Sequence, residues 1–248
     1  MKMSRSFIYY GYDKETYHHC RELIQSTNFN HTEILNIWFM LDAVMFIAFS
    51  RFNIFGVDQR RTIFYLVYFA IAAVFAFILW IFRKRTHNRS MIFAYLETVL
   101  LVSFSVLASD AQTFMAATMF PVILVVIALS FIDSMLRMGV VLILYSVIFV
   151  WRSNGSKPYS IASLDTYNTI VFLILALILH YTFQRARMQQ FETYQRNVQI
   201  TRELEVKSSF DALTSLLNRG RFFSMAGEVL RMEHDDYIAV CILDLDSF

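Results

Sequence analysis

The sequence predicts a mostly α-helical membrane protein: a bundle of about six transmembrane helices, a cytoplasmic signalling helix, and the first helix and strand of an α/β domain. Composition supports the membrane assignment. Hydrophobic residues make up 57% and charged residues 17% of the 248 residues, against about 45–50% and about 25% in soluble domains. The apolar excess is concentrated in long runs between Ile34 and Phe183, which is typical of membrane-spanning segments.

Residues 1–33 are predicted to form a cytoplasmic N-terminal segment. They are polar and aromatic, and they lack the continuous apolar stretch of a cleavable signal peptide. The formal net charge of +2 is too balanced to predict nucleic-acid binding. Cys20 and Cys241 are far apart in the sequence, which argues against a disulfide framework or a structural zinc site. Both thiols are expected to be reduced.

Residues 34–183 are predicted to form the transmembrane bundle. Helices are expected because the polar backbone groups of a segment in lipid have to be satisfied internally. The second and third apolar segments are long enough to cross a bilayer, which takes about 20 residues, whereas the fifth is the shortest and could also be re-entrant or buried. The six segments are 34–50, 62–82, 90–109, 114–132, 138–151 and 167–183.

The distribution of positive charge predicts that both termini are cytoplasmic. With this orientation most of the Lys and Arg residues that flank the apolar segments, including the run that starts at Arg83, lie on the inner side. The outer loops are short, and the longest, residues 152–166, is too small for a sensing domain. We therefore expect a multi-pass protein of the bacterial inner membrane. Its signal would be read in the lipid bilayer, at the bilayer surfaces or by the N-terminal segment.

Three ionisable residues lie within the predicted spans: Asp42 in the first, Glu97 in the third and His180 near the inner end of the sixth. A carboxylate at the centre of a span costs about 2.5–3.5 kcal/mol on insertion scales. These three residues are therefore candidates for intramembrane sensing of a proton, a metal or a ligand. The alternative is that they face the bundle interior and bond to polar neighbours such as Ser103 and Tyr145.

Three further residues in or near the spans are expected to have structural roles. Asp110 and Asp133 fall at the ends of spans, so their carboxylates are predicted to be solvated. Pro121 lies within the fourth span and is predicted to kink that helix, which membrane bundles tolerate.

Residues 184–208 are predicted to form the signalling helix as a continuation of the sixth span. The segment contains neither Gly nor Pro and is rich in Gln, Glu and Arg, which favour helix. Phe191 and Val198 are seven residues apart, as in a coiled coil, but the segment is too short for a strong heptad pattern. The helix either pairs with a second subunit and carries a rotation or register change, or it is a solvated linker.

Residues 209–248 predict the beginning of an α/β domain. A helix is expected to end near Arg231, and residues 238–243 form an apolar run rich enough in β-branched residues for a buried strand. Asp244 and Asp246 follow the run, and alternate residues of a strand point to the same face. Two carboxylates at this position suit Mg²⁺, which takes oxygen ligands and often shares them with phosphates. The alternative is that they bond to turn amides.

Two motifs in this segment carry a family resemblance. Residues 210–219 read FDALTSLLNR, and residues 244–248 read DLDSF. Together they resemble the opening of the GGDEF domain of diguanylate cyclases, whose patterns are D-x-L-T-G-L-x-N-R and, after a helix and a strand, D-[LIV]-D-x-F-K. Ser215 stands where the family usually has Gly.

The resemblance implies a homodimer that condenses two GTP molecules to cyclic di-GMP with Mg²⁺ or Mn²⁺. By position in the motif, Asp244 would be a metal ligand and Asp246 a second candidate. The backbone amides of Ser247 and Phe248 would approach the triphosphate. The catalytic GG[DE]EF loop is expected to lie beyond Phe248, so we expect residues 1–248 alone to be inactive and to be truncated relative to a functional gene product.

Asp211, Asn218 and Arg219 match motif positions that are expected to shape the domain rather than to perform chemistry. The resemblance covers only residues 209–248, so an alternative remains open. The protein could be a degenerate relative that binds nucleotide or acts as a scaffold without catalysis. A transporter is disfavoured by the few intramembrane charges and the lack of an internal repeat. A sensor histidine kinase is disfavoured because no phosphoacceptor histidine stretch follows residues 184–208.

Overall fold

The computed structural model describes residues 7–54, 59–83, 90–110, 113–211, 214 and 216–231. Within these ranges the chain is almost entirely helical, and its only β-type pairing is an isolated antiparallel bridge between Phe210 and Leu217. The chain divides into two units, Met1–Glu192 and Thr193–Phe248. The mostly α-helical class is therefore confirmed, whereas the predicted strand at residues 238–243 lies outside the described residues.

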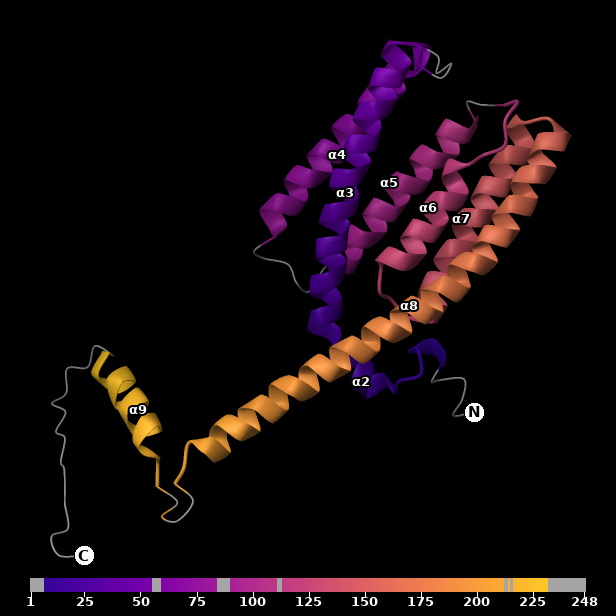
Figure 1. The fold of residues 1–248 in the computed structure, drawn as a ribbon. Helices are drawn as coiled ribbons and strands as arrows, with labels where there is room; N and C mark the ends of the chain where they lie inside the picture. Colours follow the sequence, from indigo (N-terminus) through magenta and orange to yellow (C-terminus); the bar gives the residue numbers. More distant parts are fainter. Residues whose placement is uncertain are drawn as a thin grey trace, which may run out of the picture. The chain divides into compact units, whose positions relative to one another are not determined.

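The first unit contains a short N-terminal helix and a set of long apolar helices (Figure 1). Five of them, α3, α4, α5, α7 and α8, are long and apolar enough to cross a membrane, and α6 is a shorter apolar helix. The short segment is therefore the predicted fourth span rather than the fifth. The bounds are α2 Lys14–His19, α3 Arg21–Arg51, α4 Thr62–Phe82, α5 Ser90–Asp110, α6 Met119–Ser130, α7 Met135–Ser156 and α8 Tyr159–Ser208.

Helix α3 begins at Arg21, within the segment predicted to precede the first span. The polar residues Asn28, Thr32 and Asn36 follow one another at four-residue intervals, and all three are fully buried. This spacing places them on one side of the helix, so α3 turns a polar stripe towards the interior. Its outer side carries exposed apolar residues such as Ile37. A search for continuous apolar runs misses the first turns of a helix with this pattern.

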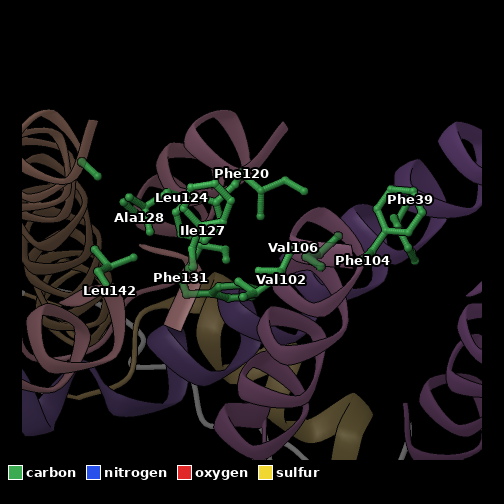
Figure 2. Packing of buried hydrophobic residues seen from close by; sticks show 14 of the residues in the cluster. Phe39, Val102, Phe104, Val106, Phe120, Leu124, Ile127, Ala128, Phe131 and Leu142 are labelled. Atoms are coloured by element: carbon green, nitrogen blue, oxygen red, sulfur yellow. The ribbon is translucent and has the colours of Figure 1, made fainter. Parts of the chain in front are cut away.

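Helix α5 is central to the first unit, because it contacts α3, α4, α6 and α7. Figure 2 shows its residues Val102, Phe104 and Val106 between Phe39 of α3 and the side chains of α6. The ring of Phe104 is fully buried, with its centroid 5.1 Å from that of Phe39 and 5.2 Å from that of Tyr68. In a bilayer, where lipid is as apolar as these side chains, close packing rather than the hydrophobic effect would hold such helices together.

The outer faces of these helices expose many large apolar side chains. Trp38 on α3, Ile63 and Trp80 on α4, and Trp151 on α7 are each more than half exposed. Soluble monomers rarely expose apolar surface over so many neighbouring helices. The surface of the first unit is therefore consistent with association with a membrane.

A buried ion pair lies where α7 ends and α8 begins. The Nζ of Lys157 is 2.8 Å from the Oδ2 of Asp165, and both side chains are completely buried. The same Nζ donates to the Oγ of Ser109 at 2.9 Å and to the carbonyl oxygen of Met115 at 3.1 Å. The Oδ1 of Asp165 accepts the Ala117 N–H at 2.7 Å. All three donors of Lys157 are thus used, and the ion pair fixes the backbone that precedes α6.

The second unit contains the end of α8, a turn and helix α9, Arg219–Arg231. The turn brings the Asp211 N–H to 2.7 Å from the carbonyl oxygen of Leu216, and the Asn218 N–H to 2.9 Å from that of Ser209. These two backbone hydrogen bonds close the turn between the two helices. The turn coincides with the sequence FDALTSLLNR, the first of the two motifs on which the resemblance rests.

Removing one member of the buried ion pair should strongly destabilise the protein. Asp165→Asn keeps the shape of the side chain but leaves the buried charge of Lys157 without its carboxylate, and breaking a buried pair costs about 3–5 kcal/mol. Arg83→Gln is the matched control, because Arg83 is largely exposed and its Nε lies 3.7 Å from the Oε1 of Glu33, and exposed pairs contribute at most about 1 kcal/mol. Thermal unfolding in one detergent measures both variants. Equal losses would contradict the structural role of Lys157 and Asp165.

Candidate functional site

The connection between α6 and α7, residues 131–134, is non-helical and buried. Its four residues are between 0% and 4% exposed. The last carbonyl groups of a helix have no partner within that helix, and an unpaired polar backbone group away from water is costly. Side chains from three other elements bond to this backbone. We call residues 128–134 and these side chains the polar junction; its side chains are Tyr10, Asn28, His31, His180, Gln184 and Arg187.

Helix α8 contributes three of these side chains. His180, Gln184 and Arg187 are four and three residues apart, so they share one face of the helix. The His180 Nδ1, the Gln184 Nε2 and the Arg187 Nη1 lie 2.7, 3.1 and 3.1 Å from the carbonyl oxygens of Ala128, Phe131 and Ser130, respectively. One face of α8 is therefore held on the C-terminal end of α6.

Helix α3 contributes Asn28 and His31. The Asn28 Nδ2 donates to the carbonyl oxygen of Ile132 at 2.8 Å, and the Ile132 N–H donates to the Asn28 Oδ1, also at 2.8 Å. The side-chain amide thus satisfies both backbone groups of one buried residue. The His31 Nδ1 lies 2.5 Å from the carbonyl oxygen of Ser130. These contacts explain why the first turns of α3 turn a polar face inwards.

The N-terminal segment reaches the polar junction through Tyr10, which is fully buried. Its hydroxyl contacts the carbonyl oxygen of Asp133 and lies 2.8 Å from the Nε2 of His180. A carbonyl oxygen can only accept, so the His180 Nδ1 that faces Ala128 carries a proton. Burial raises the pKa of the Tyr10 hydroxyl far above its ordinary value, so Tyr10 stays a neutral donor.

The prediction that Asp133 is solvated is wrong. Its side chain is 1% exposed, and its Oδ1 lies 2.6 Å from the Ser134 N–H and 2.5 Å from the Nη2 of Arg137. Its Oδ2 accepts the hydroxyl of Tyr95. Burial raises the pKa of Asp133, while the bond from Tyr95, the charge of Arg137 and the Ser134 N–H counteract part of this rise. The residue is buried because the α6–α7 connection is covered by α3, α8 and the N-terminal segment.

The three predicted sensing residues lie in different surroundings. His180 belongs to the polar junction, and Glu97 on α5 accepts a hydrogen bond from the Nδ2 of Asn36 at 3.2 Å. Asp42 is half-buried on α3, and no residue in the described part of the chain donates a hydrogen bond to it. The structure therefore supplies two separate buried polar groups rather than one sensing centre.

Other predicted contacts also differ from those observed. The hydroxyls of Ser103 and Tyr145 bond to Tyr68 and Thr98 rather than to an acidic residue. Asp110 is not fully solvated: its side chain is 13% exposed, and it pairs with an arginine of α7. Pro121 is the third residue of α6, where a missing N–H costs no helical hydrogen bond. The predicted kink is wrong because the helix begins later than the apolar run does.

The residues of the second unit that belong to the sequence FDALTSLLNR have local roles. The Oδ1 of Asp211 accepts the N–H and the hydroxyl of Thr214, both at 3.0 Å. The Oδ1 of Asn218 accepts the N–H of the third residue of α9 at 2.9 Å, as an N-cap residue does. The guanidinium carbon of Arg219 lies 6.0 Å from the ring centroid of Phe223. These contacts shape the turn and the start of α9.

The remaining predicted site residues, Asp244, Asp246, Ser247 and Phe248, lie outside the described residues. Among the residues that are described, no three His, Cys, Asp or Glu side chains are grouped so that they could hold a metal ion. A site for Mg²⁺ or Mn²⁺ therefore stays a prediction from the second motif.

The residues of the polar junction that the sequence analysis missed are Tyr10, Asn28, His31, Gln184 and Arg187. The sequence contained a pattern that could have revealed the residues of α3 and those of α8. Polar residues recur at helical spacing in the first turns of α3, and His180 is followed at helical spacing by two further donors. Their partners are backbone carbonyl groups, so the junction is suited to holding helices in register rather than to making or breaking bonds.

Comparison of the chain with known protein families, curated proteins and solved structures finds no match.

Replacing Asn28 by Leu should destabilise the polar junction. The variant leaves the N–H and the carbonyl group of Ile132 buried without partners, and each unsatisfied buried group costs about 1–3 kcal/mol. Asn154→Leu is the control, because Asn154 is exposed and its amide donates to Val150 within α7; such changes stay within about 0.5 kcal/mol. Thermal unfolding of both variants tests the difference. An Asn28→Leu protein as stable as the control would refute the two-way bond to Ile132.

Proposed function

We propose that this chain is the membrane-spanning and connecting part of a membrane-anchored diguanylate cyclase. In the complete protein a transmembrane sensory or localising module controls the condensation of two GTP molecules to cyclic di-GMP. The observation that carries the proposal is the continuity of α8. This helix runs unbroken from Tyr159 to Ser208, and the residues that follow it begin the motif FDALTSLLNR. An apolar span and the first motif of the output domain are therefore joined by a single helix.

The polar junction is the place where the bundle controls α8 in this proposal. Three side chains of one face of α8 bond to the end of α6, and Met188, one residue further along, is fully buried in a cluster with Tyr10, Cys20 and Ile132. Polar contacts in a buried site are directional, so α8 has one favoured rotation and height there. A stimulus that rearranges the α6–α7 connection changes that rotation or height, and the helix carries the change onwards.

The exposed end of α8 suits the homodimer that this activity needs. Ile200 and Leu204 are one turn apart and are 45% and 60% exposed, which offers an apolar strip to a second copy of the helix. The positive charge on the predicted inner side supports a bacterial inner-membrane location with both termini in the cytoplasm, where GTP is available.

The second motif supplies the proposed nucleotide site. Asp244 is the proposed ligand of Mg²⁺ or Mn²⁺, with Asp246 as a second ligand, and the backbone amides of Ser247 and Phe248 approach the triphosphate. A bound cation would neutralise charge on the reacting phosphate groups. Asp211 and Asn218 position the start of the domain through the turn and the cap of α9.

The proposed activity requires Asp244 in a protein with a complete output domain. Membranes that contain this protein should convert GTP to cyclic di-GMP, and Asp244→Ala should abolish the product while membrane insertion persists. Asp235→Ala, which lies outside both motifs, is the control and should keep activity. Wild-type product from Asp244→Ala would refute the role as metal ligand. No product from the folded wild type would favour the degenerate, nucleotide-binding alternative.

The coupling role of α8 can be tested by shifting its helical phase between Arg196 and Asn197. Two inserted residues rotate everything beyond them by about 200°, whereas seven inserted residues restore the phase to within about 20°. We expect the two-residue insertion to change cyclic di-GMP production several-fold and the seven-residue insertion to preserve it. Equal production from both proteins would show that α8 does not transmit rotation.

A further inference from the structure

A second buried polar group lies between α3 and α5, apart from the polar junction. The side chains of Asn36 and Glu97 are both 0% exposed, and the Asn36 Nδ2 donates to the Glu97 Oε2 at 3.2 Å. The other two oxygens of the pair, the Glu97 Oε1 and the Asn36 Oδ1, are buried and receive no hydrogen bond from the described residues. Both atoms are acceptors, so the pair lacks a donor.

No positive charge compensates Glu97 within the described part of the chain. The ion pairs formed by Arg83, Arg137, Arg152 and Lys157 do not include Glu97. The titratable groups on the helices around Glu97 mostly have partners of their own. Glu33 pairs with Arg83, and His31 faces a carbonyl oxygen. The hydroxyls of Tyr68, Tyr95 and Tyr145 form hydrogen bonds with Ser103, Asp133 and Thr98, respectively. Tyr65 packs on the ring of Phe46, and Asp42 lies further along α3.

An ionised Glu97 would therefore be a buried charge with a single neutral donor, which is a costly arrangement. A metal ion is not suited to bridge the Glu97 Oε1 and the Asn36 Oδ1. Hard cations take about six or more oxygen ligands, and only these two oxygens are without a partner here. A proton does fit. A protonated carboxyl group is a donor as well as an acceptor, so one proton on the Glu97 Oε1 can serve the Asn36 Oδ1 and satisfy both atoms at once.

We propose that Glu97 and Asn36 form a proton-binding site inside the helical bundle. Glu97 holds one proton on its Oε1 and donates it to the Asn36 Oδ1, so that two hydrogen bonds join α5 to α3. When the proton leaves to water, a carboxylate oxygen faces an amide oxygen, and the contact between the two helices weakens. Because α3 also carries Asn28 of the polar junction, protonation of Glu97 acts on the helix that holds the α6–α7 connection. This inference does not depend on cyclase activity.

Infrared spectroscopy of the whole chain in lipid nanodiscs tests the proposal at neutral pH. The wild type should show the carbonyl stretch of a protonated carboxylic acid, and Glu97→Gln should lack it. Glutamine keeps the size of the side chain, and its amide can make both hydrogen bonds to Asn36, so this variant should fold. Asp42→Asn removes another carboxylate of the bundle and is the matched control, which should keep the band.

If the wild type and Glu97→Gln show the same carboxylic acid band, or none, Glu97 is ionised and the proposal is overturned. A band that disappears only in Asp42→Asn would overturn it as well. Thermal unfolding gives a second readout: the Tm of the wild type should fall more steeply with rising pH than that of Glu97→Gln, and equal slopes would contradict a bound proton. If sodium but not choline raises the Tm of the wild type, and neither raises that of Glu97→Gln, the site binds a metal cation rather than a proton.

Discussion

The structure of the first unit depends on one constraint: α6 is too short to cross a bilayer. Its 12 residues span about 18 Å at 1.5 Å per residue, against a hydrocarbon core of about 30 Å. The non-helical backbone that borders α6 is buried at Ala117 and at residues 131–134, where its polar groups need partners. Helix α8 supplies partners at both ends, through Asp165 to the Ala117 N–H, and through His180, Gln184 and Arg187 to the last carbonyl groups of α6.

This arrangement connects a structural need with the coupling role that we propose for α8. Apolar packing between lipid-embedded helices tolerates small sliding movements, because one apolar contact replaces another. A set of directional hydrogen bonds to fixed carbonyl groups does not, since each bond is lost when the helix turns. The hydrogen bonds between α8 and α6 therefore favour one defined position of α8 over a continuous range, and a two-state element is what the proposed transmission would require. The same helix then continues to Ser208, next to the first family motif.

Elements with an apolar run between polar ends could be predicted from the sequence, and those that bury polar residues could not. The predicted second span, residues 62–82, coincides with α4, because Arg61 and Arg83 border a continuous apolar run. Helix α3 begins earlier than predicted, because its first turns bury a polar stripe. His180 was predicted as a special residue from its depth in the span, but its partner is the carbonyl group of Ala128. Every residue has a backbone carbonyl group, so the type of residue at position 128 could not predict the hydrogen bond of His180.

A comparison of Asp165 with Glu97, two of the buried acidic residues of the first unit, shows what separates a structural site from a responsive one: whether the hydrogen-bonding atoms have partners. Asp165 has a buried cation, a backbone N–H and a hydroxyl as partners, so protonating it would only remove interactions. Glu97 has one amide donor and an acceptor oxygen beside it that also lacks a donor, so adding a proton creates an interaction. A carboxylate whose oxygens all have hydrogen-bond partners gains nothing from a proton. A carboxylate that lacks a donor gains a hydrogen bond when it is protonated. Within this bundle, the responsive position is therefore the contact between α3 and α5.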